Sequence, residues 1–245
     1  EKLQKEFGIT VTVGHSARLL GGVQEIKKRI LNGELGKVGF FEANFSNERA
    51  LELTPDTWRW YKDRAPGGPL SQLAIHMFDV VNYLGETIVE ASSIASKLSP
   101  VGAEVDDQSM TLLKFSDGAI AYIGTCWTSP GIFALRVFGS KALIHYEIDF
   151  GTWDTPEKIK NSSTFYIQRG KDGFGKREVL SEPETNMFTA ELDIFAESCK
   201  SGQTSVLSAA NGNEAVACVY AALSSIDKNG VSVKLSDVLE SARNK

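Results

Sequence analysis

The spacing of apolar residues divides the chain into helical and strand-like stretches. Over residues 21–33, 69–84, 185–202 and 211–230, apolar positions recur every three or four residues, which predicts four helices. Elsewhere between residues 37 and 148 the period shortens towards two, which is the pattern of strands with one buried face.

Turn signals separate the strand-like stretches from one another. The expected strands are residues 37–47, 89–99, 108–116, 119–127, 133–139 and 142–148. Asp117-Gly118 and Gly139-Ser140 are typical of tight hairpins, and consecutive hairpins build an antiparallel sheet. The chain closes with a short strand and a helix from Ser236. The pattern therefore predicts an α+β fold, with a mostly antiparallel open sheet covered by helices on one face.

The first residues have a different character. Residues 1–8 read as the last turns of a helix ended by Gly8, and residues 9–14 as a short strand. A lone helix–strand unit of this kind looks like the tail of an α/β domain whose earlier part is missing.

The helix expected over residues 69–84 is apolar nearly all round. Gly68 and Pro69 fit its start, and Gly85 is placed to end it in a left-handed conformation. One narrow polar stripe interrupts the apolar surface; it consists of Gln72, His76, Asp79 and Tyr83. Because buried polar groups need partners, the stripe predicts either a hydrogen-bonded network or the wall of a site.

Composition excludes several classes of function. The formal net charge of −5 argues against a nucleic-acid partner, and no apolar run reaches the length of a membrane span. Three widely spaced cysteines predict buried thiols in a reducing, cytoplasmic setting. No Cys-x-x-Cys or His-x-x-x-His pair is present, so no metal site is expected.

Five segments together resemble one family. They are "VGHSARLL", "IKKRILNGELGKVGFFEANFS", "WRWYKDRAPGGPLSQLAIHMFDVVNYLGE", "EVDDQSMTLLKFSDGAIAYIGTCW" and "RVFGSKALIHYE". In this order they are similar to the Gfo/Idh/MocA family of NAD(P)-dependent sugar and cyclitol dehydrogenases. The resemblance implies a dihydrodipicolinate-reductase-like C-terminal domain, NAD or NADP as cofactor, and hydride transfer from a secondary hydroxyl of a sugar or cyclitol. It also implies that residues 1–20 are the remnant of a dinucleotide-binding Rossmann domain, and that residues 21–245 form the domain for substrate binding and oligomerisation. The family's G-x-G-x-x-G fingerprint and its Glu-Lys-Pro segment do not occur in this sequence, so we expect a fragment that is inactive without its dinucleotide domain.

The resemblance also implies roles for residues of the polar stripe. His76 matches the family's general base, which takes the hydroxyl proton as the hydride leaves. Gln72 stands where the family often has a carboxylate, so we expect it to contact substrate and to leave His76 less basic. Asp79 either holds the far side of His76, and so belongs to the substrate site, or caps neighbouring backbone.

Other candidates lie outside that helix. Arg18 follows the Rossmann-like strand and is a candidate for cofactor binding, with a surface salt bridge as the alternative. Asn44 and Asn47 end the first long strand, where their amides could bind sugar hydroxyls. Trp60 and Arg64, before the glycine turn, are further candidates for the substrate pocket. For Trp58 and Arg59 a packing role is favoured, and for His145 a partly exposed place in the sheet.

Two rival functions remain. Some relatives of this fold keep the cofactor and cleave glycosides, so an NAD-dependent glycoside hydrolase is one alternative. A non-catalytic oligomerisation or sugar-binding module is the other. Under every reading an open sheet needs a cover on its free face, so we expect a homo-oligomer, dimer or tetramer, through that face.

Overall fold

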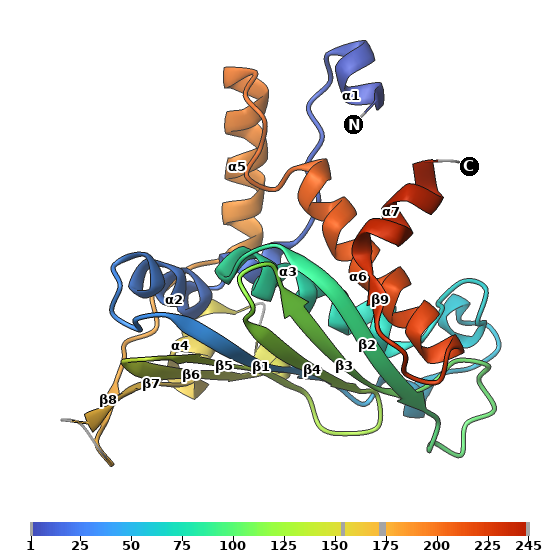
Figure 1. The fold of residues 1–245 in the computed structure, drawn as a ribbon, viewed down its shortest axis with the longest axis horizontal. Coiled ribbons are helices and arrows are strands. Elements are labelled where there is room, and N and C mark those ends of the chain that lie inside the picture. Colours follow the sequence, from blue (N-terminus) through green and yellow to red (C-terminus); the bar gives the residue numbers. More distant parts are fainter. Residues whose placement is uncertain (1, 153–154, 172–174, 244–245) are drawn as a thin grey trace.

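A single nine-stranded sheet organises the protein (Figure 1). The computed structural model describes residues 2–152, 155–171 and 175–243. The strands are β1 (Val38–Ser46), β2 (Ile88–Ser96), β3 (Gln108–Phe115), β4 (Ile120–Cys126), β5 (Ile132–Gly139), β6 (Ala142–Asp149), β7 (Thr164–Arg169), β8 (Arg177–Val179) and β9 (Val233–Lys234). Their order across the sheet is β8-β7-β6-β5-β1-β4-β3-β2-β9, and only the β1–β4 pair is parallel. The predicted α+β fold with a mostly antiparallel sheet is confirmed.

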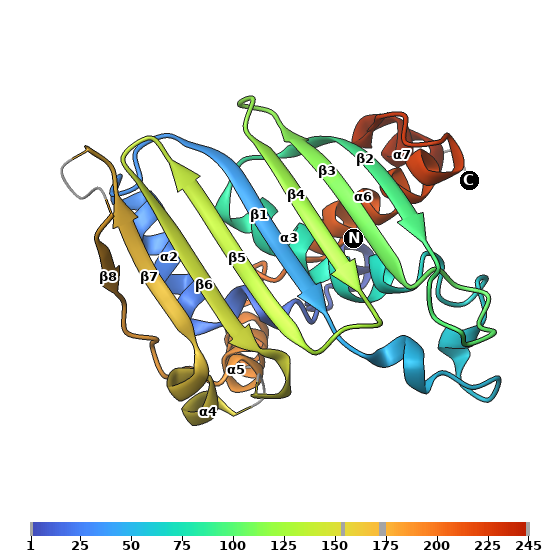
Figure 2. The same cartoon turned by 90° about the horizontal axis from the view of Figure 1, so that it is seen from below.

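The helices lie on one side of this sheet. They are α1 (Lys2–Phe7), α2 (Gly21–Leu31), α3 (Ile75–Leu84), α4 (Pro156–Ser162), α5 (Met187–Ser201), α6 (Ala209–Asp227) and α7 (Leu235–Arg243). Figure 2 shows the strands from the other side, with α2, α3 and α6 behind them. The α1 and α5 helices stand away from the sheet (Figure 1).

Alternation along the strands separates the two faces. In β1, Phe41, Ala43 and Phe45 are almost completely buried against the helices, while Glu42 and Asn44 between them are half-buried on the other face. Because side chains alternate along a strand, the helix-covered face carries the apolar core.

The open face carries exposed apolar side chains of its own. Ile94 of β2 pairs with Met110 of β3, and both are exposed, as are Leu112 and Ile120. Opposite residues on neighbouring strands share a face, so these side chains form an apolar area on the uncovered side.

Three local expectations were wrong. Residues 9–14 do not form a strand; Thr12 makes one isolated antiparallel bridge to Ser208. Gly85 ends α3 with φ −98°, so it is not left-handed; a Cβ there would lie 3.1–3.2 Å from Phe41 and Phe115, so close packing explains the glycine. Of the three thiols only that of Cys218 is buried, because Cys126 is half-buried and Cys199 is exposed.

Among the described residues, none of the helices is both long enough and apolar enough to cross a bilayer.

Candidate functional site

A glycine turn and a widened helical turn lead into α3. Gly67 and Gly68 have φ values of 70° and 51°, and a Cβ on Gly68 would lie 2.1 Å from the carbonyl oxygen of Asp106. Only glycine fits there. The first helical turn, Leu70–Ala74, is a π-helix, which continues into α3. The helix predicted over residues 69–84 is therefore present, with a π turn of the kind that recurs at functional sites.

A pocket of about 170 Å³ opens beside this helix. It is lined by Phe45, Asn47, Arg49, Arg59, Gln72, Leu73, His76 and Trp127. The structure thus brings together three of the candidates predicted from the sequence: Asn47, Gln72 and His76. Asn47 comes from the end of β1, and Gln72 and His76 come from the continuous π turn and first turn of α3, so two separate pieces of the chain meet here.

His76 is a neutral imidazole in this pocket. Burial, and then the neighbouring His15, lower the pKa of His76 to about 4, while Asp79 acts in the opposite direction. The His15 and Phe45 rings lie 6.1 Å and 6.0 Å from the His76 ring, between centroids. Nδ1 of His76 is enclosed without a hydrogen-bond partner among the described residues, so Nε2 is the nitrogen that pocket contents can reach. A neutral imidazole can accept a proton there.

Gln72 and Asn47 present amide groups to the same space. Nε of Arg59 donates to Oε1 of Gln72 at 3.3 Å, and the backbone N–H of Arg49 donates to Oδ1 of Asn47 at 3.1 Å. Each amide oxygen thus already accepts one hydrogen bond from the protein. Since an amide also carries an NH2 group with two donors, the two side chains can still donate to hydroxyl oxygens in the pocket.

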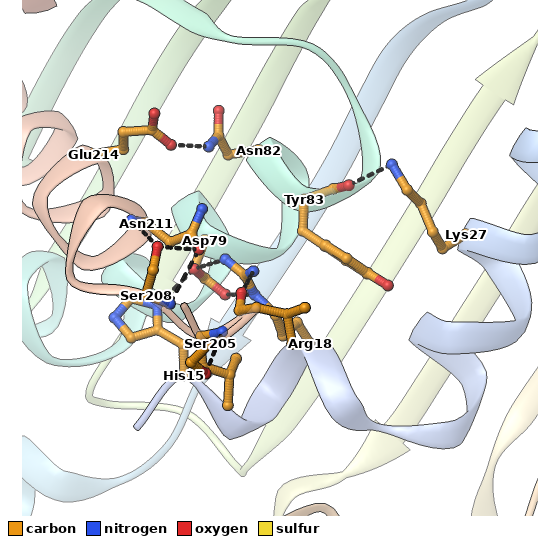
Figure 3. A network of polar contacts seen from close by, with 12 residues as sticks. His15, Arg18, Lys27, Asp79, Asn82, Tyr83, Ser205, Ser208, Asn211 and Glu214 are labelled. Carbon is orange, nitrogen blue, oxygen red and sulfur yellow. Dashed lines mark hydrogen bonds and ion pairs between the residues drawn. The ribbon is translucent and has the colours of Figure 1, made fainter. Parts of the chain in front are cut away.

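Asp79 lies one turn beyond His76, in a separate buried network (Figure 3). Arg18 donates to it from two nitrogens, with Nε 2.8 Å from Oδ2 and Nη2 on Oδ1. Nδ1 of His15 lies 2.8 Å from Oδ1 of the same carboxylate. The third guanidinium nitrogen of Arg18, Nη1, donates to the carbonyl oxygen of Val206 at 3.2 Å. The network therefore joins the N-terminal segment, α3 and the segment before α6.

The network keeps Asp79 charged. Burial by itself would raise the pKa of the Asp79 carboxyl, but hydrogen bonds and charge from His15 and Arg18 hold it below the ordinary value. Tyr83 completes the polar stripe: its ring lies under the Arg18 guanidinium at 5.0 Å, and its carbonyl oxygen accepts from Lys27 (Figure 3). The stripe is thus divided: Gln72 and His76 line the pocket, while Asp79 and Tyr83 belong to the network.

The contacts of Arg18 and Asp79 bear on the roles predicted for these two residues. Arg18 is 4 % exposed and Asp79 is 2 % exposed, so their ion pair is buried and the alternative of a surface salt bridge for Arg18 is wrong. Neither residue is in the pocket lining, and the cofactor-binding role of Arg18 and the substrate-site role of Asp79 stay predictions. Asp79 acts within the protein, on Arg18 and His15.

Three further candidates lie outside the pocket. Asn44 points to the open face of the sheet, where it accepts a hydrogen bond from Ser46 and lines a hollow with Tyr122. Trp60 packs against the core, and Arg64 is exposed over the ring of Tyr61 at 5.0 Å. The sheet period explains Asn44: two residues before Ser46, it shares the open face with Ser46.

Sequence reasoning missed several residues of the wall. Arg59 was assigned to packing, yet it lines the pocket, and Arg49 and Trp127 were not candidates. The signal for Arg59 was its place in the aromatic and basic cluster before the glycine turn. Arg49 and Trp127 follow β1 and β4, the one parallel pair, so both leave the sheet at the same edge, which no local pattern reveals. The expectation that His145 is partly exposed in the sheet is wrong, because its side chain is buried and the residue is 4 % exposed.

Comparison with known proteins places this site in a family. Residues 23–145 match the family model of the GFO/IDH/MocA C-terminal domain. A crystal structure from Desulfitobacterium hafniense DCB-2, provisionally described as an NADPH-dependent oxidoreductase, superposes with a TM-score of 0.90 at 31% identity. That match covers 97% of this chain and 68% of the other. The chain belongs to the GFO/IDH/MocA family.

Two curated dehydrogenases match at lower identity. The myo-inositol 2-dehydrogenase of Thermotoga maritima is 24% identical over 96% of this chain and 67% of its own length. The glucose-6-phosphate 3-dehydrogenase of Bacillus subtilis is 29% identical over 39% of this chain and 27% of its own length. The chain thus spans at most about two thirds of these relatives.

Proposed function

We propose that this chain carries the substrate-binding and proton-accepting half of an NAD(P)-dependent oxidoreductase, which acts on a secondary hydroxyl of a sugar or polyol. The observation that supports this most directly is that His76, a neutral imidazole, lines a pocket together with the amides of Gln72 and Asn47. Family membership supports the reaction class, and the names of the dehydrogenase relatives support the substrate class.

The residues of the pocket have different roles in the proposed reaction. The substrate hydroxyl donates a hydrogen bond to Nε2 of His76, and its proton passes to that nitrogen as the adjacent carbon is oxidised. The NH2 groups of Gln72 and Asn47 bind neighbouring hydroxyl oxygens and so fix which hydroxyl reaches His76. Phe45, Leu73 and Trp127 supply the apolar part of the wall and limit water.

The names of the dehydrogenase relatives support a nicotinamide cofactor for the proposed reaction. The pyrophosphate of such a cofactor is typically bound by a glycine-rich turn. The sequence has no G-x-G-x-x-G, so these residues do not build a pyrophosphate site, and we derive no step of the reaction from the cofactor. We propose that residues 1–20 adjoin the dinucleotide-binding part and that residues 21–245 form the substrate-binding part. The absence of disulfides among Cys126, Cys199 and Cys218 supports a reducing, cytoplasmic location.

The test uses the polypeptide that the gene encodes, with the 245-residue chain beside it. With NAD⁺ or NADP⁺ and a panel of polyols and sugars, the encoded polypeptide is expected to form reduced nicotinamide, measured by its absorbance. The 245-residue chain alone is expected to form none and to bind NADH weakly. Glycoside cleavage without net cofactor reduction would point to the hydrolase instead, and saturable micromolar NADH binding by the chain alone would refute the division into two parts.

A further inference from the structure

Two arginines enter the His76 pocket from neighbouring turns of the chain. Arg49 begins the short helical turn Arg49–Glu52, and Arg59 lies in the turn Trp58–Trp60. Both line the pocket. Their closeness shows in the pKa of Arg59, which is lowered first by burial and then by the charge of Arg49.

Neither guanidinium has an acidic partner. Every ion pair that an arginine makes among the described residues involves Arg18, Arg29, Arg136 or Arg169. The pocket lining contains no carboxylate at all. In a chain with a net charge of −5, two adjacent unpaired arginines in one small pocket stand out, because like charges close together repel unless an anion lies between them.

Arg59 is held in position for an external anion. Its guanidinium stacks over the Trp58 ring at 4.3 Å, and its Nε is used on Gln72. The terminal nitrogens make no hydrogen bond within the described residues, so they remain free for a ligand.

We propose that the pocket takes an anionic sugar, in which Arg49 and Arg59 bind a carboxylate or phosphate group while a hydroxyl lies at His76. The planar, forked guanidinium matches the oxygens of either group, and charge-assisted hydrogen bonds are stronger than neutral ones. The two arginines therefore determine specificity against neutral sugars. The statement that a hydroxyl reacts at His76 depends on the function proposed above, whereas the preference for an anion depends on the arginines alone.

Titration calorimetry with three hexoses tests the preference. The probes are glucose 6-phosphate, glucuronate and glucose, added to the wild-type chain and to three variants, Arg49→Gln, Arg59→Gln and Lys62→Gln. Lys62 is an exposed cation in the same segment, outside the pocket lining, so Lys62→Gln controls for loss of charge as such. At least one anionic hexose is expected to bind the wild type roughly 10-fold or more tighter than glucose.

Each arginine variant is expected to weaken that anionic ligand roughly 10- to 100-fold and to leave glucose unchanged, while Lys62→Gln changes neither. Which anion is preferred identifies the phosphate or the carboxylate. Equal binding of glucose, no binding of any hexose, or an anion preference that survives in both arginine variants would overturn the proposal. Because Arg49 is exposed, its variant remains informative even if Arg59→Gln unfolds the protein.

The two proposals fail in different ways. Reduction of NAD(P)⁺ by neutral polyols, unaffected by Arg49→Gln, would leave the dehydrogenase function in place and overturn the anionic substrate. Tight binding of an anionic hexose without any hydride transfer in the encoded polypeptide would leave the anionic ligand in place and overturn the dehydrogenase function.

Discussion

Arg18 and Asp79 lie 61 residues apart in the sequence and meet as a buried ion pair, in which two guanidinium nitrogens bind the two carboxylate oxygens. Loss of one partner would leave an uncompensated charge inside the protein. We therefore expect Arg18→Met to lower the free energy of unfolding by about 3–5 kcal/mol, measured by urea denaturation.

Lys160 and Glu184 provide the control for that experiment. Their atoms are 3.7 Å apart, but both side chains are about half exposed or more. Lys160→Gln is expected to cost less than about 1 kcal/mol. If Arg18→Met costs no more than Lys160→Gln, the buried pair does not hold the three segments together.

Replacement of His76 tests the proton acceptor. His76→Gln keeps a polar side chain but cannot take a proton, so kcat/KM of the encoded polypeptide is expected to fall roughly 10²- to 10⁴-fold. His145→Gln is the matched variant, because His145 lies in β6 with its ring stacked on Tyr166, outside the pocket lining. Equal activity in both variants would argue against a catalytic His76.

Gln72→Asp tests how the pocket sets the basicity of His76. The pKa of His76 is lowered to about 4, so His76 is neutral across the neutral range and the acidic limb of kcat/KM lies well below pH 6.5. A carboxylate one turn away stabilises the imidazolium and raises that pKa. The acidic limb is therefore expected to move to higher pH in Gln72→Asp and to stay in place in Gln72→Asn. An unmoved limb in Gln72→Asp would refute the idea.

Glu182 predicts a pH dependence of stability. Its Oε1 accepts from the backbone N–H of Gly22 at 2.8 Å and from the Tyr146 hydroxyl at 3.0 Å. Burial raises the pKa of Glu182 from 4.5 to about 7, against the effect of these two hydrogen bonds. Because the folded-state pKa is the higher one, the stabilisation is complete below pH 4.5 and is lost as the pH rises through about 7.

Glu182→Gln separates this contribution from other titrations. The amide oxygen can accept the same two hydrogen bonds but carries no titrating proton. Between pH 4.5 and pH 8, urea denaturation should show the wild type losing on the order of 2–3 kcal/mol relative to Glu182→Gln. Parallel stability curves for the two proteins would contradict the raised pKa.

The sequence predicts the fold well because its signals are local. The period of two, the Asp117-Gly118 hairpin and the glycines before α3 each act over a few residues, and the structure follows them. The site depends on contacts between distant segments. The pairing of Asp79 with Arg18, and the arrival of Arg49 and Trp127 beside His76, follow from strand order, which no single stretch contains.

Within the site, the sequence shows which residues of the buried helix are polar, but it does not show which partners these residues contact. The stripe from Gln72 to Tyr83 was recognised as polar on a buried helix, and all four residues make polar contacts or line the pocket. The sequence could not divide them between wall and network. That division depends on the segments that pack against the helix, since Arg18 meets Asp79 while the end of β1 lies beside His76.

The open face of the sheet predicts self-association. Ile94, Met110, Leu112 and Ile120 are 45–62 % exposed on one apolar area of the uncovered side. We expect this face to contact a second copy of the chain, since exposed apolar areas of this kind are typical of interfaces. Sedimentation velocity is expected to show an oligomer for the wild type and a monomer for Leu112→Lys. Leu192→Lys, at an exposed leucine of α5 away from the sheet, should leave the oligomer intact. A wild type that sediments as a monomer at every concentration would refute the prediction.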